Sequence, residues 1–133
     1  MKDFDFELNY NEMYVDDMKA AKEGWQTWLR VSKTILKKIQ NFNETKINRW
    51  DLKSLETYYK FFIKQIEKTI SIYSELIDLA ELCELEEQFF IKKIKELKAV
   101  GKELKKEYYC KSFKELNNKY VHGIQEAEIT SEI

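Results

Sequence analysis

Residues 58–68, YYKFFIKQIEK, place four aromatic rings among three lysines in eleven residues. At about 100° per residue, the apolar side chains of this segment fall on one broad face of a helix, and Lys60 and Lys64 fall on the opposite side. The rings diverge around the helix axis and do not form a flat platform for nucleic-acid bases. We therefore expect the rings to lie mainly in a core, on a helix that runs from about Thr45 to about Leu82.

The composition around this segment predicts an all-α protein. The chain has no proline and only three glycines among 133 residues, so the usual punctuation of turn-rich β proteins is missing. Hydrophobic residues make up 44% and charged residues 35%, which is typical of a soluble globular domain. The length fits one domain, and we expect residues 1–133 to form a single helical bundle.

Two further amphipathic stretches flank the central helix. Residues 16–42 carry apolar side chains at steps of three and four, after an acidic pair suited to capping the helix. In residues 90–108 the apolar side chains keep a helical period. This period shifts after Tyr109, which predicts a kink or a short fourth helix. Short connections, one of them within residues 80–87, make neighbouring helices antiparallel. We predict a bundle of three long antiparallel helices, the last kinked or split into a short fourth helix.

The two ends of the chain have patterns of their own. Four apolar residues alternate with polar ones near the N-terminus: Phe4, Phe6, Leu8 and Tyr10. This period of two is strand-like. We expect residues 1–15 to form an extended arm that either lies in a groove of the bundle or of a partner, or is a mobile tail. Residues 123–133 are predicted to form a frayed, polar tail.

No catalytic or cofactor motif occurs in the sequence. The single histidine, His122, has no partner at metal-ligand spacing, and Cys83 and Cys110 form neither a CxxC half-site nor a disulfide framework. The acidic clusters at residues 16–17 and 84–87 lack the spacing of a calcium loop. No glycine-rich phosphate loop or nucleophile motif is present. We expect no enzymatic activity, no metal, no cofactor and no small-molecule substrate.

Membrane association is also not expected. No stretch approaches the roughly 18 to 20 continuous apolar residues of a membrane span. The acidic N-terminus lacks the basic region and apolar run of a signal peptide. These features predict a cytoplasmic protein.

Basic residues gather on the two outer helices. Residues 1–17 hold six acids and one lysine, whereas residues 18–75 hold twelve lysines or arginines and six acids. The candidate contacts to a polyanion are Lys19, Lys22, Arg30, Lys33, Lys37, Lys95, Lys98, Lys102, Lys105 and Lys106. Only Arg30 and Arg49 are arginines, and the net charge is -1, which disfavours base-specific recognition. These stripes are either solvated faces or, if they meet, the surface of a protein that binds nucleic acid weakly and without sequence preference.

The central helix carries more apolar surface than one core contact needs. Trp50, Phe61, Ile72 and Leu79 form a line beside its main face. With them the apolar arc spans about 220°, compared with roughly 100° for a helix that faces a core on one side. Either both outer helices flank the central helix closely, or part of the arc meets another chain.

This line and the N-terminal arm are the candidate protein interface. We therefore expect a non-enzymatic protein-binding module of the inhibitor, immunity-type or adaptor kind, which docks on a protein partner. The identity of that partner is not encoded in any motif. The same surface would allow a homodimer. The alternative function is the weak nucleic-acid binding by the lysine stripes.

Overall fold

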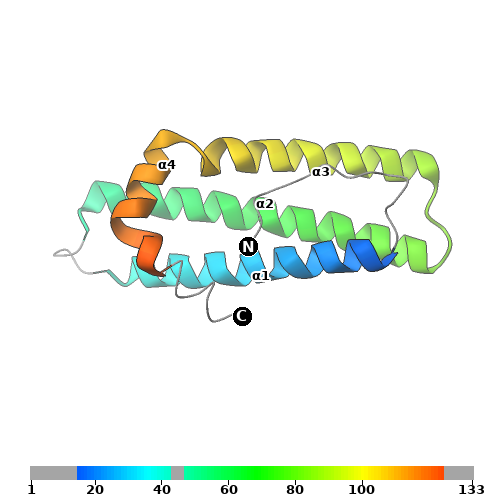
Figure 1. Ribbon diagram of the computed structural model, residues 1–133, viewed down its shortest axis with the longest axis horizontal. Coiled ribbons are helices and arrows are strands. Elements are labelled where there is room, and N and C mark those ends of the chain that lie inside the picture. The colour runs from blue at the N-terminus through cyan, green and yellow to red at the C-terminus, as the bar shows by residue number, and fades with distance from the viewer. Residues whose placement is uncertain (1–14, 43–46, 125–133) are drawn as a thin grey trace.

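The computed structural model describes residues 15–42 and 47–124. Five helical elements follow one another: α1 (Val15–Gln40), α2 (Arg49–Glu81), α3 (Glu87–Tyr108), α4 (Lys111–Leu116) and the π-helical turn η2 (Asn117–Val121). The predicted all-α bundle is confirmed, with three long antiparallel helices and a short C-terminal helical segment (Figure 1). The four candidate residues of the N-terminal arm, Phe4, Phe6, Leu8 and Tyr10, lie outside the described residues.

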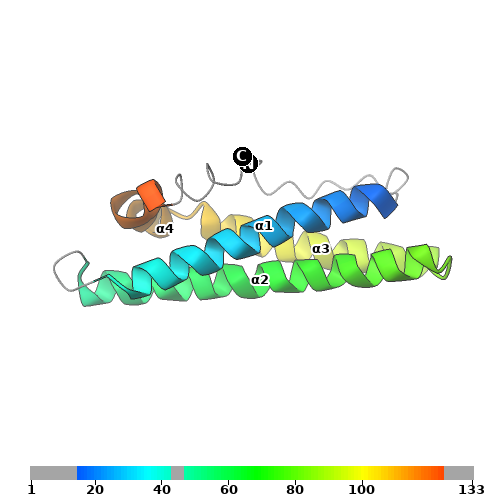
Figure 2. The ribbon, with the colours of Figure 1, turned by 90° about the horizontal axis from the view of Figure 1, so that it is seen from below.

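Helix α2 is the central helix of the bundle. It contacts both α1 and α3, and two perpendicular views place these two helices on either side of it (Figures 1 and 2). This arrangement explains the wide apolar arc of α2, because the helix is covered on two flanks. Of the two explanations for the arc, close flanking by the outer helices accounts for most of it.

The core consists of two clusters, one at each end of the bundle. We call the end closed by α4 and η2 the capped end and the end with the α2–α3 connection the turn end. The buried residues of the capped end are Val31, Ile35, Ile39, Ile47, Leu55, Tyr59, Phe62, Ile66, Val100, Leu104, Phe113 and Val121. Those of the turn end are Met18, Ile72, Tyr73, Leu76, Ile77, Phe90, Ile94 and Leu97.

The helix boundaries differ from the predicted ones by a few residues. Helix α1 begins at Val15, so Asp16 and Asp17 lie in its first turn, where they favour the positive end of the helix dipole instead of capping it. Val15 is therefore helical and does not belong to an extended arm. Helix α2 begins at Arg49, because Asn48 is its N-cap. At the C-terminal end, residues 122–124 are helical, so residues 123 and 124 do not belong to the predicted frayed tail.

The connection between α2 and α3 lies within the predicted range. The amide of Glu84 donates to the carbonyl of Leu79 at 2.9 Å, and the amide of Cys83 donates to the carbonyl of Ala80 at 3.1 Å. This pair of bonds is a Schellman motif, which ends a helix with one residue in the left-handed region. Cys83 occupies that position with φ 57°, where glycine is usual.

The predicted break after Tyr109 is confirmed. Helix α3 ends at Tyr108, and the extended backbone of Cys110 redirects the chain into α4. The segment α4–η2 then runs across the bundle from α3 toward α1 (Figure 1), and its residues Phe113 and Val121 enter the core of the capped end. No helix among the described residues is long and apolar enough to cross a membrane.

Candidate protein-binding surface

The predicted line on α2 faces α3 over part of its length. Phe61 and Leu79 are half-buried, and Phe61 packs against the core of the capped end. Trp50 is 78% exposed and lies on the first turn of α2. Helix α3 stops before it reaches that turn (Figure 1), and the line is open surface at Trp50 but buried at Ile72.

Ile72 was predicted as an interface residue, and the structure corrects this. It is 5% exposed and belongs to the core of the turn end, among Phe90, Ile94 and Leu97 of α3. The helical wheel of α2 alone does not show which part of the line α3 covers. Antiparallel packing covers the later part, so Ile72 stabilises the fold of the single chain.

The backbone around Trp50 is held by polar side chains. The Asp51 amide donates to Oδ1 of Asn48 at 2.9 Å, and Nδ2 of Asn48 donates to Oδ2 of Asp51 at 3.0 Å. The hydroxyl of Tyr120 also donates to Oδ2 of Asp51, at 2.7 Å, and so ties the C-terminal segment to α2. Trp50 is therefore exposed on a backbone that is already ordered, which lowers the entropy cost of using it in a contact.

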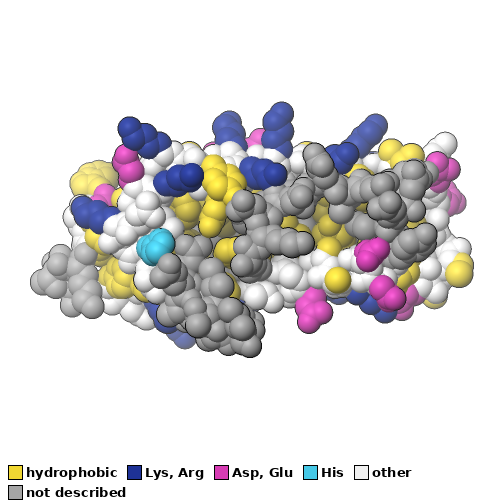
Figure 3. Space-filling view, in the orientation of Figure 1, with side chains coloured by type: hydrophobic (Ala, Val, Ile, Leu, Met, Phe, Trp, Pro, Cys, Tyr) yellow, Lys and Arg dark blue, Asp and Glu magenta, His cyan; other side chains and the backbone are white. Residues whose placement is uncertain are grey.

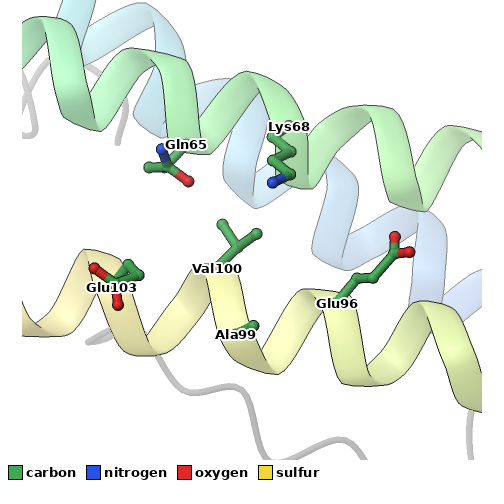
Figure 4. A pocket seen from close by; sticks show the side chains of 6 residues that line it. All are labelled: Gln65, Lys68, Glu96, Ala99, Val100 and Glu103. Atoms are coloured by element: carbon green, nitrogen blue, oxygen red, sulfur yellow. The ribbon is translucent and has the colours of Figure 1, made fainter.

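A shallow hollow opens between α2 and α3 further along the same flank. It has a volume of about 390 Å³ and is lined by Gln65, Lys68, Glu96, Ala99, Val100 and Glu103. Figure 4 shows Gln65 and Lys68 on α2 opposite the other four residues on α3, with Val100 in the gap and α1 behind. The small side chains of Ala99 and Val100 leave this space, which has an apolar floor and a polar rim.

One lysine, Lys93, bridges α2 and α3 beside the hollow. Nζ of Lys93 lies 3.4 Å from Glu75 of α2 and 3.2 Å from Glu96 of α3, and it also lies over the ring of Phe89. The hydrogen bond from Lys93 to Glu96 raises the pKa of this lysine. This bridge joins the two walls toward the turn end, whereas Lys68 and Glu103 remain on the rim of the hollow.

The four rings of residues 58–62 lie in the core or at its edge, as predicted. Tyr59 and Phe62 are buried, and both contact Phe113 of α4, with ring centroids 5.7 Å and 4.9 Å apart. The hydroxyl of Tyr59 donates to Oδ1 of Asn117 at 2.9 Å, and burial raises the pKa of this tyrosine. The Tyr58 hydroxyl accepts a weak hydrogen bond from the Cys110 thiol at 3.5 Å. These rings leave no stacking platform for bases.

The two lysine stripes lie on opposite edges of the bundle, because α1 and α3 flank α2 from opposite sides (Figures 1 and 2). They do not meet in one groove. On α1, Lys19 pairs with Glu81 of α2 at 2.9 Å and Lys33 pairs with Glu67 of α2 at 4.0 Å. On α3 all five stripe lysines are exposed.

His122 is exposed on the last helical turn. Over residues 15–42 and 47–124, no three His, Cys, Asp or Glu side chains come together as a metal-binding group. Cys83 and Cys110 are free thiols, the first in the exposed turn and the second between α3 and α4.

Sequence reasoning did not identify several residues of this surface. The hollow depends on Ala99 and Val100 facing α2, and a single-helix pattern does not show which partner they face. The contacts of Asn117 and Tyr120 join residues 58 and 69 positions apart, for which the sequence holds no local signal. A signal did exist for the start of α2, since Asn48 followed three residues later by an acid is typical of a helix N-cap.

Comparison with known proteins adds no family. Scans against protein-family models, curated proteins and solved structures found no match to this chain.

Proposed function

We propose that this protein is a non-enzymatic protein-binding module, of the inhibitor or adaptor kind, that docks through the α2–α3 face. The observation that carries the proposal is Trp50, a large apolar side chain that is 78% exposed on an ordered helix start. The core at this end is closed without it. Tryptophan is the residue type most enriched among the energetically dominant contacts of protein interfaces.

The rest of the face has the composition of an interface. Trp50 and Lys68 are 18 residues apart, which is five helical turns, so both point to the same side of α2, about 27 Å apart along its axis. Half-buried Phe61 lies between them, followed by the hollow with its apolar floor and polar rim. A central apolar surface surrounded by polar groups is the usual anatomy of a protein interface. Burying an aromatic side chain on association removes about 150–250 Å² from water.

Site-specific photocrosslinking in the native host tests the proposal. A benzophenone amino acid at position 50 should yield a reproducible protein adduct. The same group at Gln26, which is exposed on α1, should yield none. An adduct with a second copy of the chain would identify the partner as a homodimer.

Trp50→Ala supplies the matched binding measurement. The variant should lose at least tenfold in affinity for the crosslinked protein, while its free energy of unfolding changes by less than about 0.5 kcal/mol, as for an ordinary surface substitution. Gln26→Ala is the control and should change neither quantity. Equal crosslinking at positions 26 and 50, or undiminished binding by Trp50→Ala, would contradict the proposal.

A further inference from the structure

The outer face of α3 carries a row of lysines with no acid among them. Lys95, Lys98, Lys102, Lys105 and Lys106 are all exposed and fall within about 100° of helical arc. The row is about 17 Å long at 1.5 Å per residue. Figure 3 shows basic side chains along the edge of the molecule formed by α3 and α4.

The acids that lie within or directly after the row, residues 95–107, are on a different flank. Glu96 and Glu103 line the hollow beside α2, and Glu107, four residues beyond Glu103, continues that flank. Within the described part of the chain, none of the five lysines makes an ion pair with an acidic side chain. Among residues 15–42 and 47–124, no acidic side chain pairs with this row, in contrast to Lys19 and Lys33 on α1, which pair with acids of α2.

We propose that the outer face of α3 alone binds the phosphate backbone of nucleic acid, without sequence preference. This surface is separate from the α2–α3 face and does not depend on the proposed function. Lysine neutralises phosphate as a point charge, and contacts to the phosphate backbone of nucleic acid do not depend on the base sequence. The absence of arginine from α3 accords with binding that does not distinguish bases.

Other anionic partners fit this face less well. A protein interface is depleted of lysine at its centre and enriched in aromatic residues, whereas between residues 95 and 106 this arc holds only lysines. A helix that lies in a membrane surface inserts an apolar face into the headgroup region. The apolar face of α3 is instead buried in the core, through Phe90, Ile94, Leu97 and Leu104.

The test is a titration of the full chain with a fluorescent 30-base-pair duplex of mixed sequence at several salt concentrations. If all five lysines neutralise phosphates, the slope of log K against log salt should be about -4.5. The triple variant Lys98→Gln, Lys102→Gln, Lys105→Gln should reduce the slope to about -1.8. Its affinity at 0.1 M salt should fall by about 500-fold, since each lost contact costs about eightfold there.

A matched triple variant on α1 removes the same charge from the opposite edge. Lys22→Gln, Lys33→Gln, Lys37→Gln should leave affinity within about threefold and the slope nearly unchanged, because the α1 stripe makes no phosphate contact. Replacing Lys98, Lys102 and Lys105 with arginine should preserve binding, and circular dichroism should show all variants folded. Because arginine keeps the positive charge, this variant still tests the proposal if the glutamine substitutions disturb the fold of α3.

Three results would overturn the proposal. One is equal loss of affinity in the α1 and α3 glutamine variants, which would indicate a response to net charge. Another is loss of binding on replacement by arginine. The third is tighter, α3-dependent binding to vesicles of 30% phosphatidylserine or to polyglutamate, which would assign the face to a membrane surface or an acidic protein.

Discussion

The capped end and the turn end of the bundle are closed by different kinds of hydrogen bonds. At the capped end, hydrogen bonds from Tyr59 to Asn117 and from Tyr120 to Asp51 join residues 58 and 69 positions apart. At the turn end the chain is closed by the short connection around Cys83, whose hydrogen bonds are all local. The capped end therefore depends on docking of the C-terminal segment, whereas the turn end depends on a local turn.

The largest effect is expected from Phe113→Ala at the capped end. Phe113 is 1% exposed and its ring contacts those of Tyr58, Tyr59, Phe62 and Tyr108. Removing a buried phenylalanine ring leaves a cavity and costs about 3–5 kcal/mol. Urea unfolding should show this loss, and hydrogen exchange should show that α4 opens before the turn end. If both ends open together, the proposal that they are stabilised differently is wrong.

Alkaline pH should destabilise both ends through their buried tyrosines. Burial raises the pKa of Tyr73 at the turn end to about 12, and burial also raises that of Tyr59 at the capped end. Unfolded tyrosine titrates near 10, so above this pH the unfolded state releases protons that the folded state retains. Stability is therefore full below pH 10 and falls above it, by up to about 1.4 kcal/mol per pH unit for each tyrosine.

Unfolding free energies between pH 9 and pH 11.5 measure this slope. Tyr59→Phe and Tyr73→Phe should each flatten the slope. If the free energy of unfolding of both variants falls with pH as steeply as that of the parent protein, other groups are responsible and this explanation is wrong.

A comparison at neutral pH isolates the buried hydrogen bond of the capped end. Tyr59→Phe removes the donor to Asn117, whose side chain is buried, and should cost about 1–3 kcal/mol. Tyr73→Phe is the matched control at the turn end and should cost less, because no described hydrogen bond joins the Tyr73 hydroxyl to another residue. Thermal or urea unfolding of the two variants checks the difference. Equal costs would show that the Tyr59–Asn117 bond adds nothing specific to the capped end.

The smallest effect is a gain in stability at the turn end. Cys83 has a left-handed backbone, which costs a residue with a side chain about 1–2 kcal/mol. Cys83→Gly should therefore raise the free energy of unfolding by about 1 kcal/mol, after allowance for the greater freedom of glycine in the unfolded chain. Cys83→Ala keeps the Cβ atom and should give no gain. If alanine stabilises as much as glycine, the thiol and not the backbone conformation is responsible.

Much of the fold followed from local patterns in the sequence. The period of apolar residues predicted the three long helices, and the phase shift after Tyr109 predicted the break before α4. The connection within residues 80–87 was predicted although Cys83 is an unusual helix terminator. Of the predicted site residues described by the structure, Trp50 is exposed, Phe61 and Leu79 are half-buried, and Ile72 is in the core. The helical wheel of α2 shows in which direction each side chain points. It does not show how far along α2 the partner helix α3 extends and covers those side chains.

By itself the sequence determined the helical class, the order of the helices and the positions of the lysine stripes, because these depend on residues within a few turns of one another. Only the tertiary structure decided that α2 lies between α1 and α3, and that Asn117 and Tyr120 close the capped end. It also decided that acids of α2 pair with lysines of the α1 stripe, whereas the α3 row has none of these partners within the described residues. Such contacts join residues far apart in the chain, and they depend on which side chains fit together when the helices pack.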